Sequence, residues 1–126
     1  MGSEEEWLLG DPRLAQAVDR FNQGDWYAAH DQFEELWHET QGPLRPALQG
    51  VLQIAVAHVH LERGNLHGAT VLLGEGVGRL SRAEDDAMGL DLQALRNLAS
   101  DRLRRLQHGL PLDACPPLQL RAVGAE

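Results

Sequence analysis

Two histidine–glutamate pairs are the residues of this sequence best placed to do chemistry. His30 and Glu34 lie four residues apart, and His58 and Glu62 repeat that His-x-x-x-Glu spacing. In an α-helix, residues four apart share one face, so both side chains of a pair can converge on one point. Imidazole and carboxylate are ligands for zinc, iron and manganese. One pair is half of such a site, so the pattern predicts either a metal centre completed from elsewhere or a hydrogen bond that satisfies a partly buried histidine.

A second helix would have to complete the site, and the chain offers two histidines for that purpose. His30 lies 12 residues before Gly42, and His58 lies 12 residues after Pro46, with a predicted turn centred near residue 44 between them. If the flanking helices pack antiparallel, positions 30 and 58 come to the same height. His60 lies on the opposite side of its helix from His58, roughly 160° away. Only one of the two can face the first helix, and the residues do not decide which.

The helix that carries these histidines is predicted over 46–63, and it is apolar nearly all round. The exception is a narrow polar stripe of Gln49, Gln53 and His60, whereas His58 lies among apolar neighbours. A helix with this pattern is central and buried. The stripe makes Gln49 and Gln53 candidate supporting residues of a pocket.

The stretch 21–38 holds five of the six aromatic residues and should anchor the core. Of these, we expect Trp26, Phe33 and Trp37 to be largely buried. Trp7 lies outside the stretch, in a lead-in over 1–10 that we expect to be frayed, with Trp7, Leu8 and Leu9 docking on the body.

Helix caps and breakers predict five helices. Asp11-Pro12 begins the first, which runs to about 22, and Gly24-Asp25 separates it from the second, over 26–41. The third covers 46–63, the fourth runs from the Asn65 cap to about 82, and the fifth covers 92–107 with Asp91 as its cap. Residues 84–91 read as a loop and 111–126 as a tail. The glycines at 74, 76 and 78 imitate a phosphate loop, but no strand precedes them, so close helix packing is the better interpretation.

An internal repeat links the first four helices. Residues 24–29 (GDWYAA) resemble residues 64–69 (GNLHGA), displaced by 40 positions, and each block falls at a turn between helices. We therefore expect one all-α domain over 1–126, made of two stacked antiparallel helical hairpins of a tetratricopeptide-like kind plus a fifth helix.

An ordered set of motifs resembles a known family. His30-x-x-x-Glu34-x-x-Trp37 matches the HxxxExxW signature of the domain of unknown function family 309, small prokaryotic helical proteins. Phe21-Asn22-x-Gly24 before the signature, Gln49-Gly50-x-x-Gln53 and His60-x-x-Arg63-Gly64-Asn65 after it extend the resemblance to about 12–82. The resemblance implies a compact helical fold and a suggested metal role for His30 and Glu34, with Trp37 as a packing element. It also favours His60 over His58 as their partner.

Composition excludes several classes of function. Residues 1–41 carry the whole net charge of −8 and the remainder is neutral, which argues against nucleic-acid binding. All 11 basic residues are arginine, so lysine chemistry is excluded. One cysteine forms neither an internal disulfide nor a cysteine zinc site.

The opening residues are acidic and no apolar stretch is long enough to cross a bilayer, so we expect a cytoplasmic protein without membrane contact. Unpaired helix faces predict a homo-oligomer. The basic cluster over 96–105 is either a solvated face or the site of an acidic protein partner.

Two functions therefore stay open, and the sequence does not decide whether the protein is an enzyme. The first is a metal or ligand site formed by His30, Glu34 and His60 (or His58), supported by Trp37, Gln49 and Gln53, with zinc, manganese or iron as the cofactor. The second is a non-catalytic helical interaction module in which the His–Glu pair is structural.

Overall fold

The structure, a computed structural model, describes residues 3–124, and that part of the chain is all-α as predicted. It contains the helices α1 (Glu4–Leu9), α2 (Pro12–Asn22), α3 (Trp26–Glu39), α4 (Arg45–Glu62), α5 (Leu66–Leu80) and α6 (Leu92–Gln107). A short 3₁₀ turn, η1 (Ala87–Gly89), lies within the predicted loop before α6. Within residues 3–124, no helix is both long and apolar enough to span a membrane.

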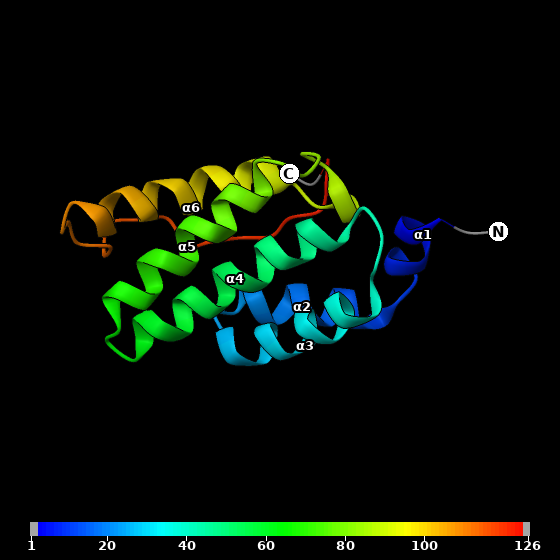
Figure 1. Ribbon diagram of the computed structural model, residues 1–126, viewed down its shortest axis with the longest axis horizontal. Helices are drawn as coiled ribbons and strands as arrows, with labels where there is room; N and C mark the ends of the chain where they lie inside the picture. The colour runs from blue at the N-terminus through cyan, green and yellow to red at the C-terminus, as the bar shows by residue number, and fades with distance from the viewer. Residues whose placement is uncertain (1–2, 125–126) are drawn as a thin grey trace.

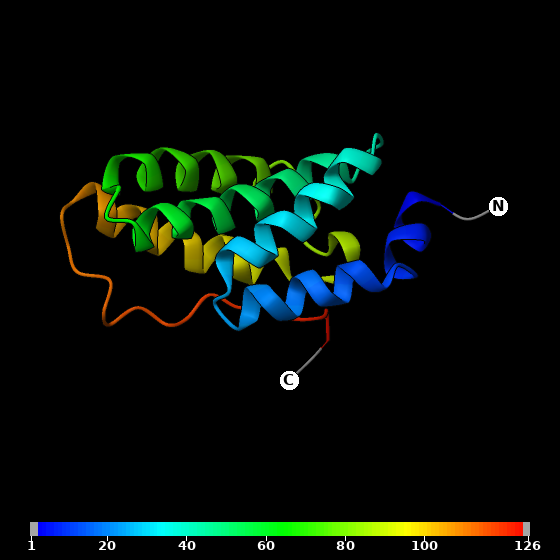
Figure 2. The same ribbon diagram turned by 90° about the horizontal axis from the view of Figure 1, so that it is seen from below.

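The helices pack in chain order from α2 to α6. Figure 1 shows α4 between α3 and α5, with α6 beyond α5, and Figure 2 shows α2 on the side of α3 away from α4. The central helix is buried along most of its length, as its apolar wheel predicts: Ala47, Leu48, Gly50, Val51, Leu52, Ile54, Ala55, Ala57 and His58. The tetratricopeptide-like stacking of the two hairpins stays a prediction.

Helix starts follow the predicted caps. The side chain of Asp11 accepts the backbone N–H of Arg13 at 2.9 Å, next to Pro12 at the first position of α2. Asn65 and Asp91 cap α5 and α6 in the same way, at 2.9 and 3.0 Å. Asp25 makes no such bond, so the start of α3 depends on its backbone turn.

That turn is one of two copies. Gly24 and Gly64 have φ of 76° and 77°, a left-handed conformation that glycine adopts without steric cost. The residue after each glycine donates its backbone N–H to the carbonyl five residues earlier, at 3.0 Å in the first turn and 2.9 Å in the second. Ala29 and Ala69, 40 residues apart, are both fully buried one turn into the next helix. The sequence repeat is therefore a repeat of turn geometry.

Helices α4 and α5 touch backbone to backbone. A Cβ atom placed on Gly76 would lie 2.9 Å from the carbonyl oxygen of Gly50 and 2.8 Å from Cγ1 of Ile54. A Cβ on Gly78 would meet nothing within 4 Å. The interpretation of this glycine run as close helix packing thus fits Gly76, whereas Gly78 faces open space.

The aromatic anchor is less buried than expected. Phe33 is fully buried and meets the edge of Phe21, which is also fully buried, at 6.4 Å between ring centroids. Trp26 and Trp37 pack against the core but are only partly buried. Each carries a polar neighbour on its ring: Trp26 lies against His58 and Trp37 against Arg45.

The N-terminal segment is a helix rather than a frayed lead-in. Leu8 is fully buried, whereas Trp7 and Leu9 are exposed, so only one of the three expected contacts forms. The Glu4 carboxylate accepts the backbone N–H groups of Gly42 and Leu44, each at 2.7 Å. Two backbone donors on one carboxylate hold α1 on the turn between α3 and α4. Residues 1–2 of the expected lead-in lie outside the described residues.

The expected tail also packs on the body. Residues 116–123, which we call the strap, run extended past α6 and the end of α2 (Figure 2). Leu118 and Leu120 are only 2% and 1% exposed. The prolines at 116 and 117 indicate a segment that is not helical, but they do not exclude docking. Residues 125–126 of the expected tail lie outside the described part of the chain.

Candidate functional site

The His30 and Glu34 side chains meet on α3. His30 Nε2 lies 2.8 Å from Glu34 Oε2, and the two side chains are 24% and 44% exposed. The second ring nitrogen of His30, Nδ1, lies 3.3 Å from a carboxylate oxygen of Asp31. The one-turn spacing therefore does bring imidazole and carboxylate together, on a face that solvent reaches.

His38 extends this pair, and the sequence analysis missed it. Its Nε2 lies 3.6 Å from the second carboxylate oxygen of Glu34, so His30, Glu34 and His38 form a ladder over two turns of α3. The signal was present, because position 38 is four residues after position 34. In the described residues, no group of three or more His, Cys, Asp or Glu side chains is arranged to hold a metal ion.

His58 lies in a different environment. It is 3% exposed, its Nδ1 lies 2.8 Å from the carbonyl oxygen of Ile54, and its ring stacks on Trp26 at 4.5 Å. A carbonyl oxygen only accepts, so Nδ1 carries the proton and Nε2 accepts from Arg102 Nη1 at 3.3 Å. Burial is the main cause that lowers the pKa of His58 to about 4, and the Arg102 charge adds to it. His58 is a neutral core histidine.

The register between α3 and α4 explains why His58 misses His30. The sequence argument centred the turn near residue 44 and set position 58 opposite position 30. However, α3 ends at Glu39 and α4 begins at Arg45. The centre of the turn is thus displaced toward the N-terminus, and position 58 lies opposite Trp26, one helical turn away from His30.

The polar stripe of α4 faces other partners. His60 Nδ1 lies 3.1 Å from the Asn65 side chain at the end of α4. Gln53 donates to Glu75 at 3.0 Å and accepts from Arg79 at 2.9 Å, so it supports α5. Gln49 is half-buried. Among the predicted site residues, only His30 and Glu34 are brought together.

Trp37 holds the end of α3 to the start of α4. The Arg45 guanidinium lies 3.9 Å from the centre of the indole ring and donates to the Trp37 carbonyl at 2.9 Å. A cation over an indole face is attracted by the ring quadrupole. The geometry fits the packing role that the family signature implies for this residue.

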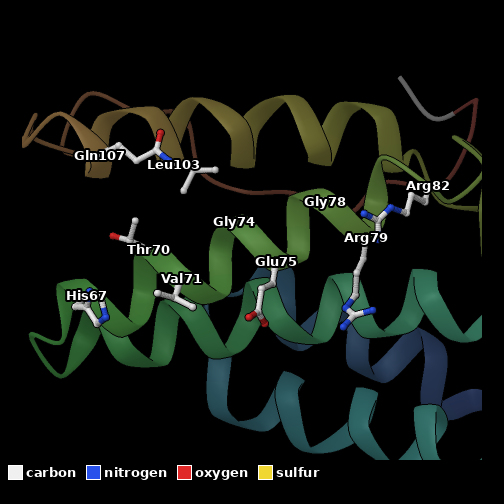
Figure 3. A pocket seen from close by; sticks show the side chains of 10 residues that line it. All are labelled: His67, Thr70, Val71, Gly74, Glu75, Gly78, Arg79, Arg82, Leu103 and Gln107. Carbon is white, nitrogen blue, oxygen red and sulfur yellow. The ribbon is translucent and has the colours of Figure 1, made fainter.

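A hollow lies between α5 and α6, where no site was predicted. It has a volume of about 610 Å³. Figure 3 shows Thr70, Leu103 and Gln107 around the space between the two helices, with Glu75 and Arg79 directed toward α4. Its lining combines charged, polar and glycine positions: His67, Thr70, Val71, Gly74, Glu75, Gly78, Arg79, Arg82, Leu103 and Gln107.

The strap has a docking site of its own, built around Asn22. The Asn22 side chain donates to the Leu120 carbonyl at 2.8 Å and accepts the Leu120 N–H at 2.7 Å. Arg102 donates to the Pro116 carbonyl at 2.9 Å. In the sequence, Asn22 stands out only as part of the Phe21-Asn22-x-Gly24 motif. The alternation of leucines at 118 and 120 is the signal that could have revealed its partner.

The segment that carries these residues is similar to a known protein family. Residues 14–72 match the domain of unknown function DUF309. The resemblance drawn from the HxxxExxW signature is therefore confirmed. The DUF309 segment begins in α2 and ends in α5, so it includes Asn22, His30, Glu34 and Trp37 but neither α6 nor the strap. A search of curated proteins found no match to this chain. The family description carries no activity, so function has to be argued from geometry.

Proposed function

We propose that the protein is a non-catalytic helical interaction module in which the His30–Glu34 pair is structural. The observation that carries this proposal is that every histidine predicted for the site has a protein partner. His30 pairs with Glu34, His58 lies between Ile54 and Arg102, and His60 contacts Asn65.

The His30–Glu34 geometry fits a structural role. A partly buried imidazole needs an acceptor for its N–H, and the Glu34 carboxylate lies 2.8 Å from Nε2. A pair this exposed to solvent contributes little to folding, because water competes for both partners. It fixes the ring of His30 on the surface of α3 without forming an enclosed reaction site.

A metal titration tests this proposal. Protein purified without a histidine tag should bind none of zinc, manganese or iron(II) in calorimetry. His30→Ala should lower the free energy of unfolding by less than about 1 kcal/mol, as losses of exposed ion pairs do. The exposed Glu35→Ala on the same helix is the control. Stoichiometric metal binding that His30→Ala abolishes would contradict the structural role.

A cation site on α3 is the second candidate, because His30 and His38 both approach Glu34, at 2.8 and 3.6 Å, although the three side chains would have to turn before they met at one ion. These residues would supply two imidazoles and a carboxylate to zinc, manganese or iron, at about 2.0–2.2 Å for zinc. Metal loss in His38→Ala but not in His60→Ala would assign the ions to this ladder. Loss in His60→Ala with His38→Ala unaffected would assign them to the set predicted from the sequence.

Self-association remains part of the proposal. Three large apolar side chains at or after the starts of α3 and α5 are exposed, namely Tyr27, Leu66 and Val71. Exposed apolar faces of this kind seek partners. We expect a dimer in sedimentation at high protein concentration, and a lone monomer there would contradict it.

A further inference from the structure

The strap is held through its main chain. Besides the two bonds from Asn22 to Leu120, the Arg121 carbonyl accepts the Asp91 N–H at 2.8 Å, and the Val123 N–H donates to the Gly89 carbonyl at 2.8 Å. At its start, the Pro116 carbonyl accepts from Arg102. These contacts come from the end of α2, from α6 and from the loop before α6, and all of them use the main chain of the strap. The Gln119 side chain adds a longer bond, from Nε2 to the Asn22 carbonyl at 3.4 Å.

Over residues 118–121, the side chains of the strap alternate between the body and solvent. Leu118 and Leu120 are buried, Gln119 between them is half-buried, and Arg121 is exposed. This period of two is that of an extended strand. When a peptide binds as an added strand, main-chain hydrogen bonds provide affinity and pockets for alternate side chains provide specificity. The strap is bound by the same combination, although its partners are helix ends and a loop.

The surface that holds the strap, formed by Asn22, Arg102 and residues 89–91, is called the strap groove. We propose that this groove is a binding site for an extended peptide segment of a partner protein. The segment would carry two leucines or similar apolar side chains two residues apart, and the strap occupies the groove in cis as its competitor. The inference rests on the proposed function and names the class of partner.

The attachment of the strap supports exchange. Residues 108–115, which join α6 to the strap, have no regular helix and are mostly exposed. Asn22 belongs to the DUF309 segment, whereas the strap lies outside it. Asn22 thus binds the backbone of the strap and not a particular side chain. Any peptide with the same alternation of apolar side chains can make the same backbone hydrogen bonds.

Competition in the full-length protein tests the proposal. The variant Leu118→Ala/Leu120→Ala weakens the strap in cis, and a fluorescent peptide of residues 116–124 serves as the probe. We expect the variant to bind this peptide at least tenfold more tightly than the parent, whose tethered strap competes at high effective concentration. Adding Asn22→Ala to this variant should weaken its affinity for the peptide at least tenfold. Arg121→Ala, at an exposed position of the strap, is the matched control, and it should behave as the parent does.

Two outcomes would overturn the proposal. A helical variant that fails to bind the peptide would make the groove a packing surface for its own strap. If Asn22→Ala abolishes dimers of the parent, the occupant of the groove is the strap of a second copy.

If the double alanine variant unfolds, a parent protein with a protease site placed within residues 110–114 is used in its place. After cleavage, the bound strap should exchange with labelled peptide, and absence of exchange would be equally decisive. The metal titration tests the proposed function separately, so the two failures are distinguishable.

Discussion

Acidification from pH 6.5 to pH 4 is expected to remove on the order of 3 kcal/mol of folding free energy through His58 alone. The pKa of this histidine is about 4 in the folded protein, below its ordinary value of 6.5, chiefly because the ring is buried. Between these values the unfolded chain binds a proton that the folded chain does not. Stability therefore falls as pH falls through this window and is unaffected by His58 above it. The Arg102 guanidinium at 3.3 Å makes a protonated ring still less favourable.

Urea unfolding between pH 7.5 and pH 4 measures this effect, with His58→Gln as the control. The variant is expected to be less stable at neutral pH but to lose the slope between pH 6.5 and pH 4. The arginine partners of Asp11, Glu39 and Asp101 lower the pKa of each carboxyl, so the stability that these groups contribute begins to be lost near pH 5, at the lower end of the same window. That loss is common to the parent and to His58→Gln, so the difference between the two slopes reports His58. An unchanged slope in His58→Gln would mean that another group titrates there.

Gly76→Ala is expected to destabilise the protein by about 1–3 kcal/mol, although alanine is the better helix former. The added methyl group would lie 2.9 Å from the backbone oxygen of Gly50, which cannot move without shifting α4. Gly78→Ala, two residues along the same helix, meets open space and should instead stabilise by up to about 1 kcal/mol.

Thermal unfolding of the two variants side by side gives the comparison. Opposite signs at positions 76 and 78 are the expected result. Equal stabilisation by both would mean that α4 and α5 do not touch at Gly50.

Local signals in the sequence were sufficient for α2 to α6 but not for α1, which was expected to be a frayed lead-in. Asp11-Pro12, the two turn glycines and Asp91 fix helix boundaries through neighbouring backbone groups, and the observed limits differ from the predicted ones by two residues or fewer. The apolar wheel of residues 46–63 likewise identified the central helix, because burial on every side needs no knowledge of which neighbours provide it.

The site could not be predicted as fully, because it depends on contacts between distant segments. A wheel shows that His58 and His60 point apart, but not that Trp26 and Arg102 enclose His58. A displacement of the turn centre by about two residues moved His58 one helical turn from His30. The partner of Asn22 lies 98 residues away in the chain, and the alternation of leucines at 118 and 120 indicates a docked segment without showing that Asn22 holds it.

That separation has a consequence for the order in which the molecule forms. Contacts between successive helices close short loops and form quickly, whereas the strap must close a loop from Asn22 to Leu120. Asn22, Asp91 and Arg102 also precede the strap along the chain, so synthesis from the N-terminus delivers its docking groove first. Docking of the strap is therefore expected to be a late step of folding, which follows formation of the helices that hold it.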